Sequence, residues 1–97
     1  MRVLGLDVGN KKIGISLSDT TRSIAQGLKV YRRTTLEKDL EELKLVVEEH
    51  GIGKIVIGLP KDLNGAIGKK AAEVMAFAEA VQKYTSIGIV LWDERFT

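Results

Sequence analysis

The sequence has no cysteine, one proline, one tryptophan and one histidine among its 97 residues. Without cysteine it can form no disulfide, thiol nucleophile or thiolate metal site, and one histidine cannot build a zinc centre of the usual composition. Any metal would therefore be held by oxygen atoms. No apolar run approaches the roughly 20 residues of a membrane-spanning helix, and the start MRVLGLDVG lacks a signal-peptide cleavage site. We expect a soluble, cytoplasmic protein without a membrane partner.

Charge is distributed unevenly along the chain, although the formal net charge is only +2. Residues 37–49 contain six acidic and two basic residues, which leaves 13 of the 15 basic and seven of the 13 acidic residues elsewhere. A surplus of basic residues suits a polyanion such as nucleic acid, although many soluble domains are similarly basic. The charge pattern therefore gives mild support to a nucleic-acid partner.

The hydrophobic pattern predicts a single α/β domain, because 97 residues supply one core and no more. Residues 2–8 and 13–18 are short strands rich in Val, Ile and Leu, and the turn-prone Gly9-Asn10 between them indicates a hairpin. A third strand is expected within residues 24–32. The domain therefore begins with three antiparallel strands.

The periodicity changes at Leu36, from which apolar residues recur at helical spacing as far as Val47. Thr34 stands three residues before Glu37, which is the spacing of a capping box, and Gly51 is suited to end a helix. These signals predict a helix that starts near Leu36 and stops before Gly51.

The remaining elements are a strand, a helix and a strand. Residues 54–59, KIVIGL, are apolar nearly throughout, as expected for a strand that is covered on both faces, and Pro60 ends it. A helical stripe follows over residues 67–83, and residues 87–92 form the last strand. Right-handed crossovers would place the fourth and fifth strands parallel to the first, in a mixed five-stranded sheet of order 3-2-1-4-5.

An aspartate interrupts the first strand: in LGLDVGNKKIGISLSD, residues 4–19, Asp7 stands among apolar residues. A carboxylate in apolar surroundings costs several kcal/mol unless a cation, a metal or hydrogen-bond donors accompany it. The parallel order brings Asp7 to the same sheet edge as Asp93 and Glu94, and paired carboxylates suit Mg²⁺ or Mn²⁺. The plainer alternative stays open, in which Asp7 caps the turn and the other two acids form a solvated strand end.

Two further features each have a functional and a plain interpretation. The loop GLPKDLNG lies between a strand and a helix, where backbone amides can accept an anion, but it also reads as an ordinary connection. It lacks the GxxxxGK[ST] pattern of a Walker loop. Trp92 is interpreted as core packing, with base stacking as the outside alternative.

Three motifs, LDVGNKKIGISLSD, VIGLPKDLNG and DERFT, occur in this order over essentially the whole chain. Together they resemble the YqgF family, also called RuvX, which comprises Holliday-junction-resolvase-like proteins and pre-16S rRNA nucleases. The resemblance implies a ribonuclease H-like fold and metal-dependent hydrolysis of phosphodiesters in structured RNA or branched DNA, in the bacterial cytoplasm.

The resemblance also implies roles for individual residues. Asp7 matches the family's first-strand acid, and Asp93-Glu94-Arg95 matches its DER motif. Asp7 and Glu94 are the expected ligands of Mg²⁺ or Mn²⁺, with Asp93 the alternative to Glu94 because neighbouring strand positions point to opposite faces. The residues expected to bind the nucleic-acid backbone are Lys11, Lys12, Lys61 and Arg95.

The end of the sequence departs from the family, whose members continue beyond DERFT through a helical segment with a third acid. We therefore expect residues 1–97 to be a C-terminally truncated nuclease domain, with a natural chain that lacks this segment as the alternative. In both cases the metal site would be incomplete, and the uncovered surface would favour self-association, as in a homodimer. Two other classes stay open. One is a non-catalytic nucleic-acid-binding or ribosome-assembly module; the other is a phosphate-binding half of an actin-like ATPase fold, which the short length disfavours.

Overall fold

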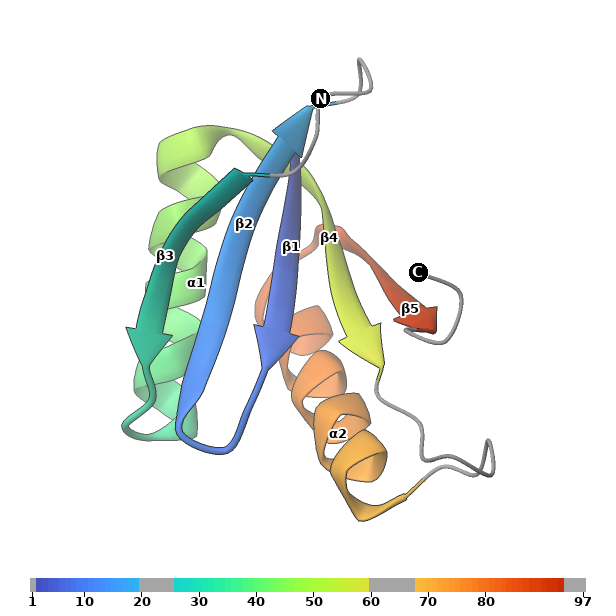
Figure 1. Cartoon of the computed structure of the whole chain (residues 1–97). Helices are drawn as coiled ribbons and strands as arrows, with labels where there is room; N and C mark the ends of the chain where they lie inside the picture. The colour runs from blue at the N-terminus through green and yellow to red at the C-terminus, as the bar shows by residue number, and fades with distance from the viewer. Residues whose placement is uncertain (1, 20–25, 60–67, 94–97) are drawn as a thin grey trace.

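The computed structural model describes residues 2–19, 26–59 and 68–93, which form a sheet and two helices (Figure 1). The elements in chain order are β1 (Arg2–Val8), β2 (Lys12–Asp19), β3 (Gln26–Arg32), α1 (Leu36–His50), β4 (Ile52–Leu59), α2 (Lys69–Tyr84) and β5 (Gly88–Asp93). Every strand and helix predicted from the sequence is present, with bounds that differ by a few residues. The predicted start of the second helix at residue 67 lies outside the described residues.

The strands form one mixed sheet in the order β3-β2-β1-β4-β5. β1 pairs antiparallel with β2, and β2 with β3, whereas β1, β4 and β5 run parallel to one another. This is the predicted order, in which both crossovers between parallel strands step in the same direction across the sheet. The carboxyl ends of β1, β4 and β5 therefore lie at one edge of the sheet, and the arrows of all three strands point downward in Figure 1.

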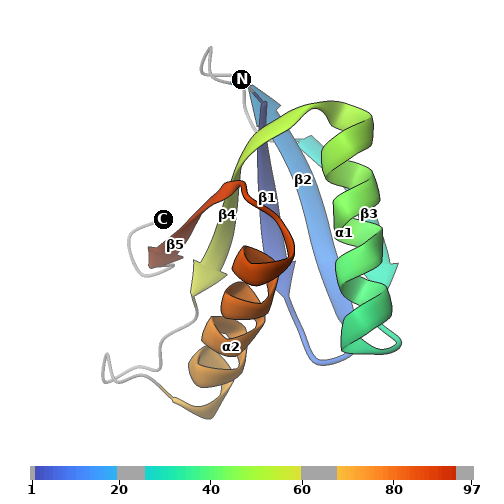
Figure 2. The same ribbon diagram turned by 180° about the vertical axis from the view of Figure 1, so that it is seen from behind.

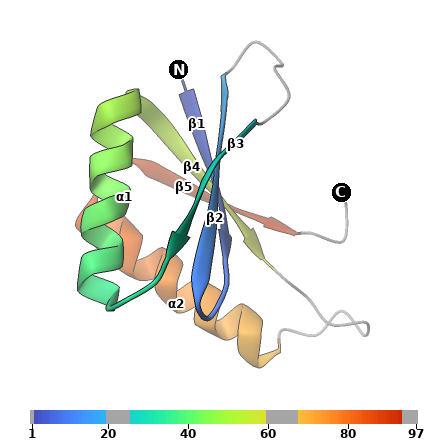
Figure 3. The same cartoon turned by 60° about the vertical axis from the view of Figure 1, so that its left-hand side comes forward.

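Both helices pack on the same face of the sheet, as the views from behind and from the side show (Figure 2 and Figure 3). Neither is long and apolar enough to cross a membrane, within the described ranges. Each fully buried aliphatic side chain between the two layers contributes about 1.5–3 kcal/mol of burial free energy. The largest buried apolar side chains of this core include Leu4, Leu6, Ile13, Ile15, Leu43, Val46, Ile55, Ile57, Val74, Phe77 and Val81.

The second face of the sheet is covered by no helix of the described residues, and we call it the open face (Figure 3). The prediction that residues 54–59 are covered on both faces is wrong for this part of the chain, because Ile55 and Ile57 are buried whereas Lys54 is exposed. Apolar residues also occupy the open face, so the strand shows no clear alternation. By strand alternation, the open face carries Gly5, Asp7, Lys12, Gly14, Ser16, Val30, Arg32, Lys54, Val56, Gly58, Val90 and Trp92.

The N-cap of α1 is Thr35 and not the predicted Thr34. The Thr35 hydroxyl oxygen accepts a hydrogen bond from the backbone N–H of Lys38 at 3.2 Å. Thr34 instead donates its own backbone N–H to Oδ1 of Asp39 at 3.1 Å. Gly51 ends the helix as predicted, in the left-handed conformation (φ 63°) that glycine adopts without strain.

Candidate active site on the open face

Asp7 lies on the open face, near the carboxyl end of β1. Its neighbours in the strand, Leu6 and Val8, are buried against the helices, whereas Asp7 is exposed. The desolvation cost that a carboxylate would carry inside an apolar core therefore does not arise here. Among the described residues, no group donates a hydrogen bond to its carboxylate. The interpretation of Asp7 as a cap of the following turn thus gains no support from the contacts in this part of the chain.

Glycine stands on both sides of Asp7 in the sheet. Gly14 of β2 is the antiparallel partner of Asp7. Leu6 pairs with Ile57 of β4, which brings the next residue, Gly58, to the other side of Asp7. A Cβ atom built on Gly14 would lie only 3.6 Å from Cβ of Asp7. Because neither neighbour has a side chain, the Asp7 carboxylate is open to a ligand that approaches from above the sheet.

Larger side chains border the two glycines. Gly14 pairs with Val30 of β3, and Gly58 pairs with Trp92 of β5. These residues belong to the lining of a groove of about 580 Å³ whose floor includes Asp7. Among the described residues that line the groove, Asp7 is the one acid and Lys29 the one base, and most of the others are glycine or apolar. A carboxylate on the floor of such a groove suits a ligand that carries a bound cation.

Trp92 is half exposed, with 49% of its surface accessible, so its predicted core packing is wrong. The cause is strand alternation: Ile89 packs against the core, whereas Trp92 lines the groove on the open face. Its aromatic ring is therefore available for stacking, the alternative function considered for this residue.

The second acidic position lies at the same edge of the sheet as Asp7. Asp93 ends β5 and pairs with Leu59 of β4. β4 alone separates β1 from β5, so their backbones lie about 10 Å apart at this edge. The predicted convergence of the first-strand and last-strand ends is thus confirmed for the backbone. Of the other predicted site residues, Glu94, Lys61 and Arg95 lie outside the described residues.

The described residues do not by themselves complete a metal centre. Within ranges 2–19, 26–59 and 68–93, no group of three His, Asp or Glu side chains is arranged to hold an ion. Mg²⁺ and Mn²⁺ nevertheless need few protein ligands, since one or two carboxylates and several waters complete an octahedral set, and an exposed carboxylate such as Asp7 fits one position of it. The chemistry of the donors thus agrees with the predicted type of metal.

The predicted backbone-binding lysines Lys11 and Lys12 lie at the turn between β1 and β2. Both are exposed. The carbonyl oxygen of Lys12 accepts a hydrogen bond from the backbone N–H of Gly9 at 2.9 Å, which closes the turn. The carbonyl oxygen of Lys11 accepts a hydrogen bond from the backbone N–H of Arg33 at 2.8 Å. The backbone of the turn is therefore fixed, while both ammonium groups remain available to solvent or a ligand.

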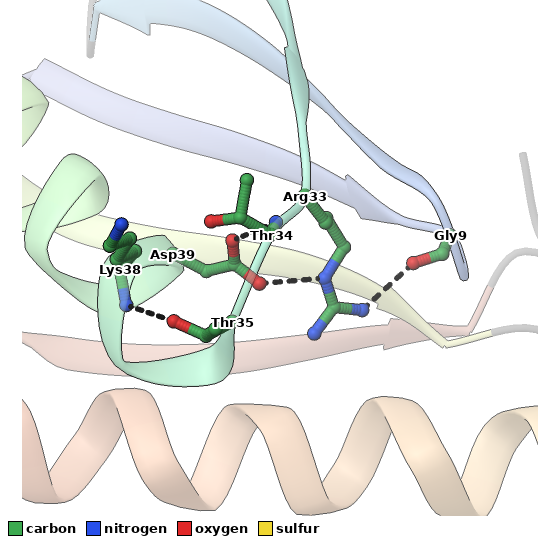
Figure 4. A network of polar contacts seen from close by, with 6 residues as sticks. All are labelled: Gly9, Arg33, Thr34, Thr35, Lys38 and Asp39. Carbon is green, nitrogen blue, oxygen red and sulfur yellow. Dashed lines mark hydrogen bonds and ion pairs between the residues drawn. The ribbon is translucent and has the colours of Figure 1, made fainter.

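A polar network centred on Arg33 and Asp39 lies next to this turn and was not predicted from the sequence (Figure 4). Arg33 donates from Nε to Oδ2 of Asp39 at 2.9 Å and from a terminal nitrogen to the carbonyl oxygen of Gly9 at 2.9 Å. Its guanidinium carbon also lies 5.0 Å from the centre of the Phe77 ring. Arg33 thus connects both helices with the turn that follows Asp7. These contacts hold the turn, and with it the end of β1, in place.

The sequence contained a signal for this network. Asp39, Leu43 and Val46 stand at helical spacing on one face of α1, and all three are buried. A charged residue on the buried face of a helix requires a partner, because an unpaired buried charge is costly. The excess of acidic residues in 37–49 hides this requirement, because Asp39 is one of six acids in that segment.

Comparison with solved structures defines the class of fold. RuvC from T. thermophilus, in complex with a Holliday junction substrate, aligns with 96% of this chain and 64% of its own, at a TM-score of 0.66 and 13% identity. An exopolyphosphatase from Cytophaga hutchinsonii aligns with 96% of this chain and 34% of its own, at a TM-score of 0.55 and 12% identity. With the observed strand order, the first likeness establishes the ribonuclease H-like fold that the sequence predicted.

Sequence comparison defines the family. The sequence model of RuvX, described as Holliday junction resolvase, matches residues 1–97. A protein of Carboxydothermus hydrogenoformans is 50% identical over 97 residues, and one of Thermoanaerobacter pseudethanolicus is 46% identical over the same length. Both are named "Putative pre-16S rRNA nuclease", and the chain covers 70% of the length of each. The chain belongs to the RuvX family of nucleases.

Proposed function

We propose that this domain is the larger part of a metal-dependent nuclease that hydrolyses phosphodiesters in structured nucleic acid. One observation supports the proposal most strongly: Asp7 is an exposed carboxylate between two glycines, at the sheet edge where β5 ends in Asp93. A carboxylate in this setting can share a cation with the phosphate of a ligand that lies along the groove. The family membership agrees with this chemistry.

In the proposed site, acidic residues bind the metal ion and basic residues bind the nucleic-acid backbone. Asp7 and Glu94 would hold Mg²⁺ or Mn²⁺, with Asp93 as the alternative second ligand. A divalent ion, when bound, neutralises phosphate charge and lowers the pKa of water. Glycines beside Asp7 admit the sugar-phosphate backbone. The proposed backbone-binding residues are Lys11, Lys12, Lys61 and Arg95.

The proposed substrate is structured RNA, in particular the 5′ end of pre-16S rRNA, or branched DNA. The names of the two relatives support the RNA, and the Holliday junction bound to T. thermophilus RuvC supports the DNA. Lysine and arginine contacts to phosphate do not read bases, so we expect recognition of shape and charge rather than of sequence.

A non-catalytic nucleic-acid-binding or ribosome-assembly module is the second candidate. It is favoured by one observation, namely that the described residues contain no set of three metal ligands. A half of an actin-like ATPase is less well supported. The family model that matches residues 1–97 is one of Holliday junction resolvases and not of ATPases.

A cleavage assay separates the two main candidates. The chain is tested alone and after extension with the C-terminal segment of the C. hydrogenoformans relative, on a pre-16S leader hairpin and a four-way DNA junction. We expect little cleavage by the 97-residue chain and Mg²⁺-dependent cleavage by the extended chain, abolished by Asp7→Asn and unchanged by Glu41→Gln, an exposed acid on α1. An extended chain that binds but does not cut either substrate would favour the non-catalytic module.

A further inference from the structure

Two cations face each other directly across the open face. Lys12 at the start of β2 is the cross-strand partner of Arg32 at the end of β3, and both are exposed. In the next pair of the ladder, Ile13 is buried and Tyr31 packs against the core. Because successive strand residues point to opposite faces, Lys12 and Arg32 lie together on the open face.

This pairing contradicts the usual charge pattern of a sheet, since like charges directly opposite each other are destabilising. The ion pairs of the described residues are Lys29 with Glu42 and Arg33 with Asp39, so neither Lys12 nor Arg32 is neutralised by an acid in this part of the chain. Both side chains are pure hydrogen-bond donors, which an anion satisfies and a neutral ligand does not. A local conflict of this kind is expected where a functional ligand compensates it.

The pair also lies close to Asp7. The adjacent row of the open face contains Gly14, opposite Asp7, and Val30, opposite Gly14. Lys12 and Arg32 are two residues away from Gly14 and Val30 along their strands, which corresponds to about 7 Å. The cation pair therefore occupies the row of the open face next to the row of Asp7. Arg32 also lines a second, polar hollow of about 530 Å³, together with Asn10 and Lys11 of the turn and with the acids Asp39 of α1 and Glu73 of α2. Asp39 is paired with Arg33, and among the described residues no ion pair joins Glu73 to Lys12 or Arg32.

We propose that Lys12 and Arg32 together form a binding site for one backbone phosphate of a nucleic acid, next to the phosphate at Asp7. This inference rests on the proposed function for its ligand. The planar guanidinium of Arg32 can bind two phosphate oxygens at once, while the ammonium group of Lys12 acts as a point charge beside it. Arg32 is thereby a nucleic-acid-binding residue in addition to those expected from the sequence.

β3 is an edge strand, and charged residues on edge strands also protect against pairing with other chains. The two roles differ in what they predict. A protective charge has no specific effect on nucleic-acid affinity, whereas a phosphate contact contributes to the salt dependence of binding. Removal of one charge from a ligand-binding pair should also relieve repulsion and leave the free protein as stable as before, or more so.

The test compares Lys12→Gln and Arg32→Gln with Lys54→Gln, which removes the same charge from the far end of the open face, where Lys54 pairs with Val3 and Gly88. Affinity for a labelled RNA hairpin and a four-way DNA junction is measured between 50 and ~300 mM salt in EDTA. We expect each site variant to lower the slope of log K against log salt by about 0.9, which is about tenfold in affinity at 0.1 M salt. Lys54→Gln should change neither.

Other outcomes are equally decisive. If all three variants lower the slope alike, the effect is one of net charge and the site does not exist. If the site variants lose affinity for inorganic polyphosphate but not for the hairpin or the junction, the pair is a general anion site and the nucleic-acid assignment is overturned. The melting temperature of Arg32→Gln should equal or exceed that of the parent chain. Because the assay contains no metal and no cleavage, its result is independent of whether the extended chain proves to be a nuclease.

Discussion

Nε of Arg33 donates to Oδ2 of Asp39 at 2.9 Å, and only 1% of Asp39 is exposed (Figure 4). Asp39 is the one charged residue that is buried in the described part of the chain. The same guanidinium donates to the carbonyl oxygen of Gly9, two residues after Asp7. The ion pair thus joins the beginning of α1 to the turn that leads away from the candidate site.

Disruption of this pair should destabilise the domain. We expect Asp39→Asn or Arg33→Met to lower the free energy of unfolding by about 3 kcal/mol, the lower end of the range for breaking a buried pair, because Arg33 retains partial exposure. Urea unfolding measures the loss. The exposed pair of Lys29 and Glu42 is the control, and Glu42→Gln should cost less than about 1 kcal/mol. Equal losses at both pairs would contradict the importance of burial.

Access to Asp7 should depend on its glycine neighbours. In the extended chain, Gly14→Val places a branched side chain beside the carboxylate and should reduce cleavage by about 100-fold, the effect of misplacing a reacting group by roughly 1 Å. Valine is favourable in a strand, so stability should change little. Ser18→Val, further along the open face of the same strand, where Ser18 pairs with Val3, is the matched control. Unaltered cleavage by Gly14→Val would mean that the substrate does not approach over this strand.

Binding of nucleic acid should be weak to moderate, tolerant of sequence and strongly dependent on salt. The candidate contacts are dispersed lysines and arginines without a base-reading element, so counterion release dominates the affinity. Titrations of hairpins with scrambled sequence but the same fold, at two salt concentrations, measure both properties. An affinity that is insensitive to salt would be inconsistent with these contacts.

The apolar part of the open face should promote self-association of the 97-residue chain. Val30 is 67% exposed, Val90 39% and Trp92 49%. Exposed apolar side chains on one face of a sheet favour contact with a second copy. Sedimentation velocity should show mass that rises with concentration, and Val30→Lys should reduce the effect. A strictly monomeric chain at several hundred micromolar, or association unaffected by this variant, would rule out the open face as the contact.

The sequence predicted the strand order well because the change from alternating to helical periodicity is strong, and crossover rules leave few topologies for such an order. It did not predict which face of the sheet the helices leave uncovered. Val56 and Trp92 are apolar residues that lie on the open face. Their apolar character alone predicts burial in a core, so the sequence does not reveal that this face is uncovered. Asp7 is exposed because both helices pack on the other face of the sheet. The sequence pattern does not predict that arrangement.

Details of polar contacts were less predictable. Thr34 and Thr35 are adjacent and chemically equivalent as N-caps, and the direction of the backbone after β3 decides between them. The spacing of Asp39 on the buried face of α1 indicates that it needs a partner, but it does not identify Arg33 as that partner, because the pairing depends on how the segment after β3 approaches α1. The convergence of Asp7 with the end of β5 was predictable, in contrast, because parallel order alone requires it.

Binding of Mn²⁺ to the ¹⁵N-labelled chain tests most directly whether Asp7 anchors a divalent-ion site. Paramagnetic broadening should appear first at the amides of Asp7, Gly14, Gly58 and Trp92, which share one row of the open face. Asp7→Asn should raise the dissociation constant at least about tenfold, since the ion loses a charged ligand, whereas Glu41→Gln should leave it unchanged. Broadening centred on the acidic residues of α1, or a site at β1 that survives Asp7→Asn, would contradict the proposed metal centre.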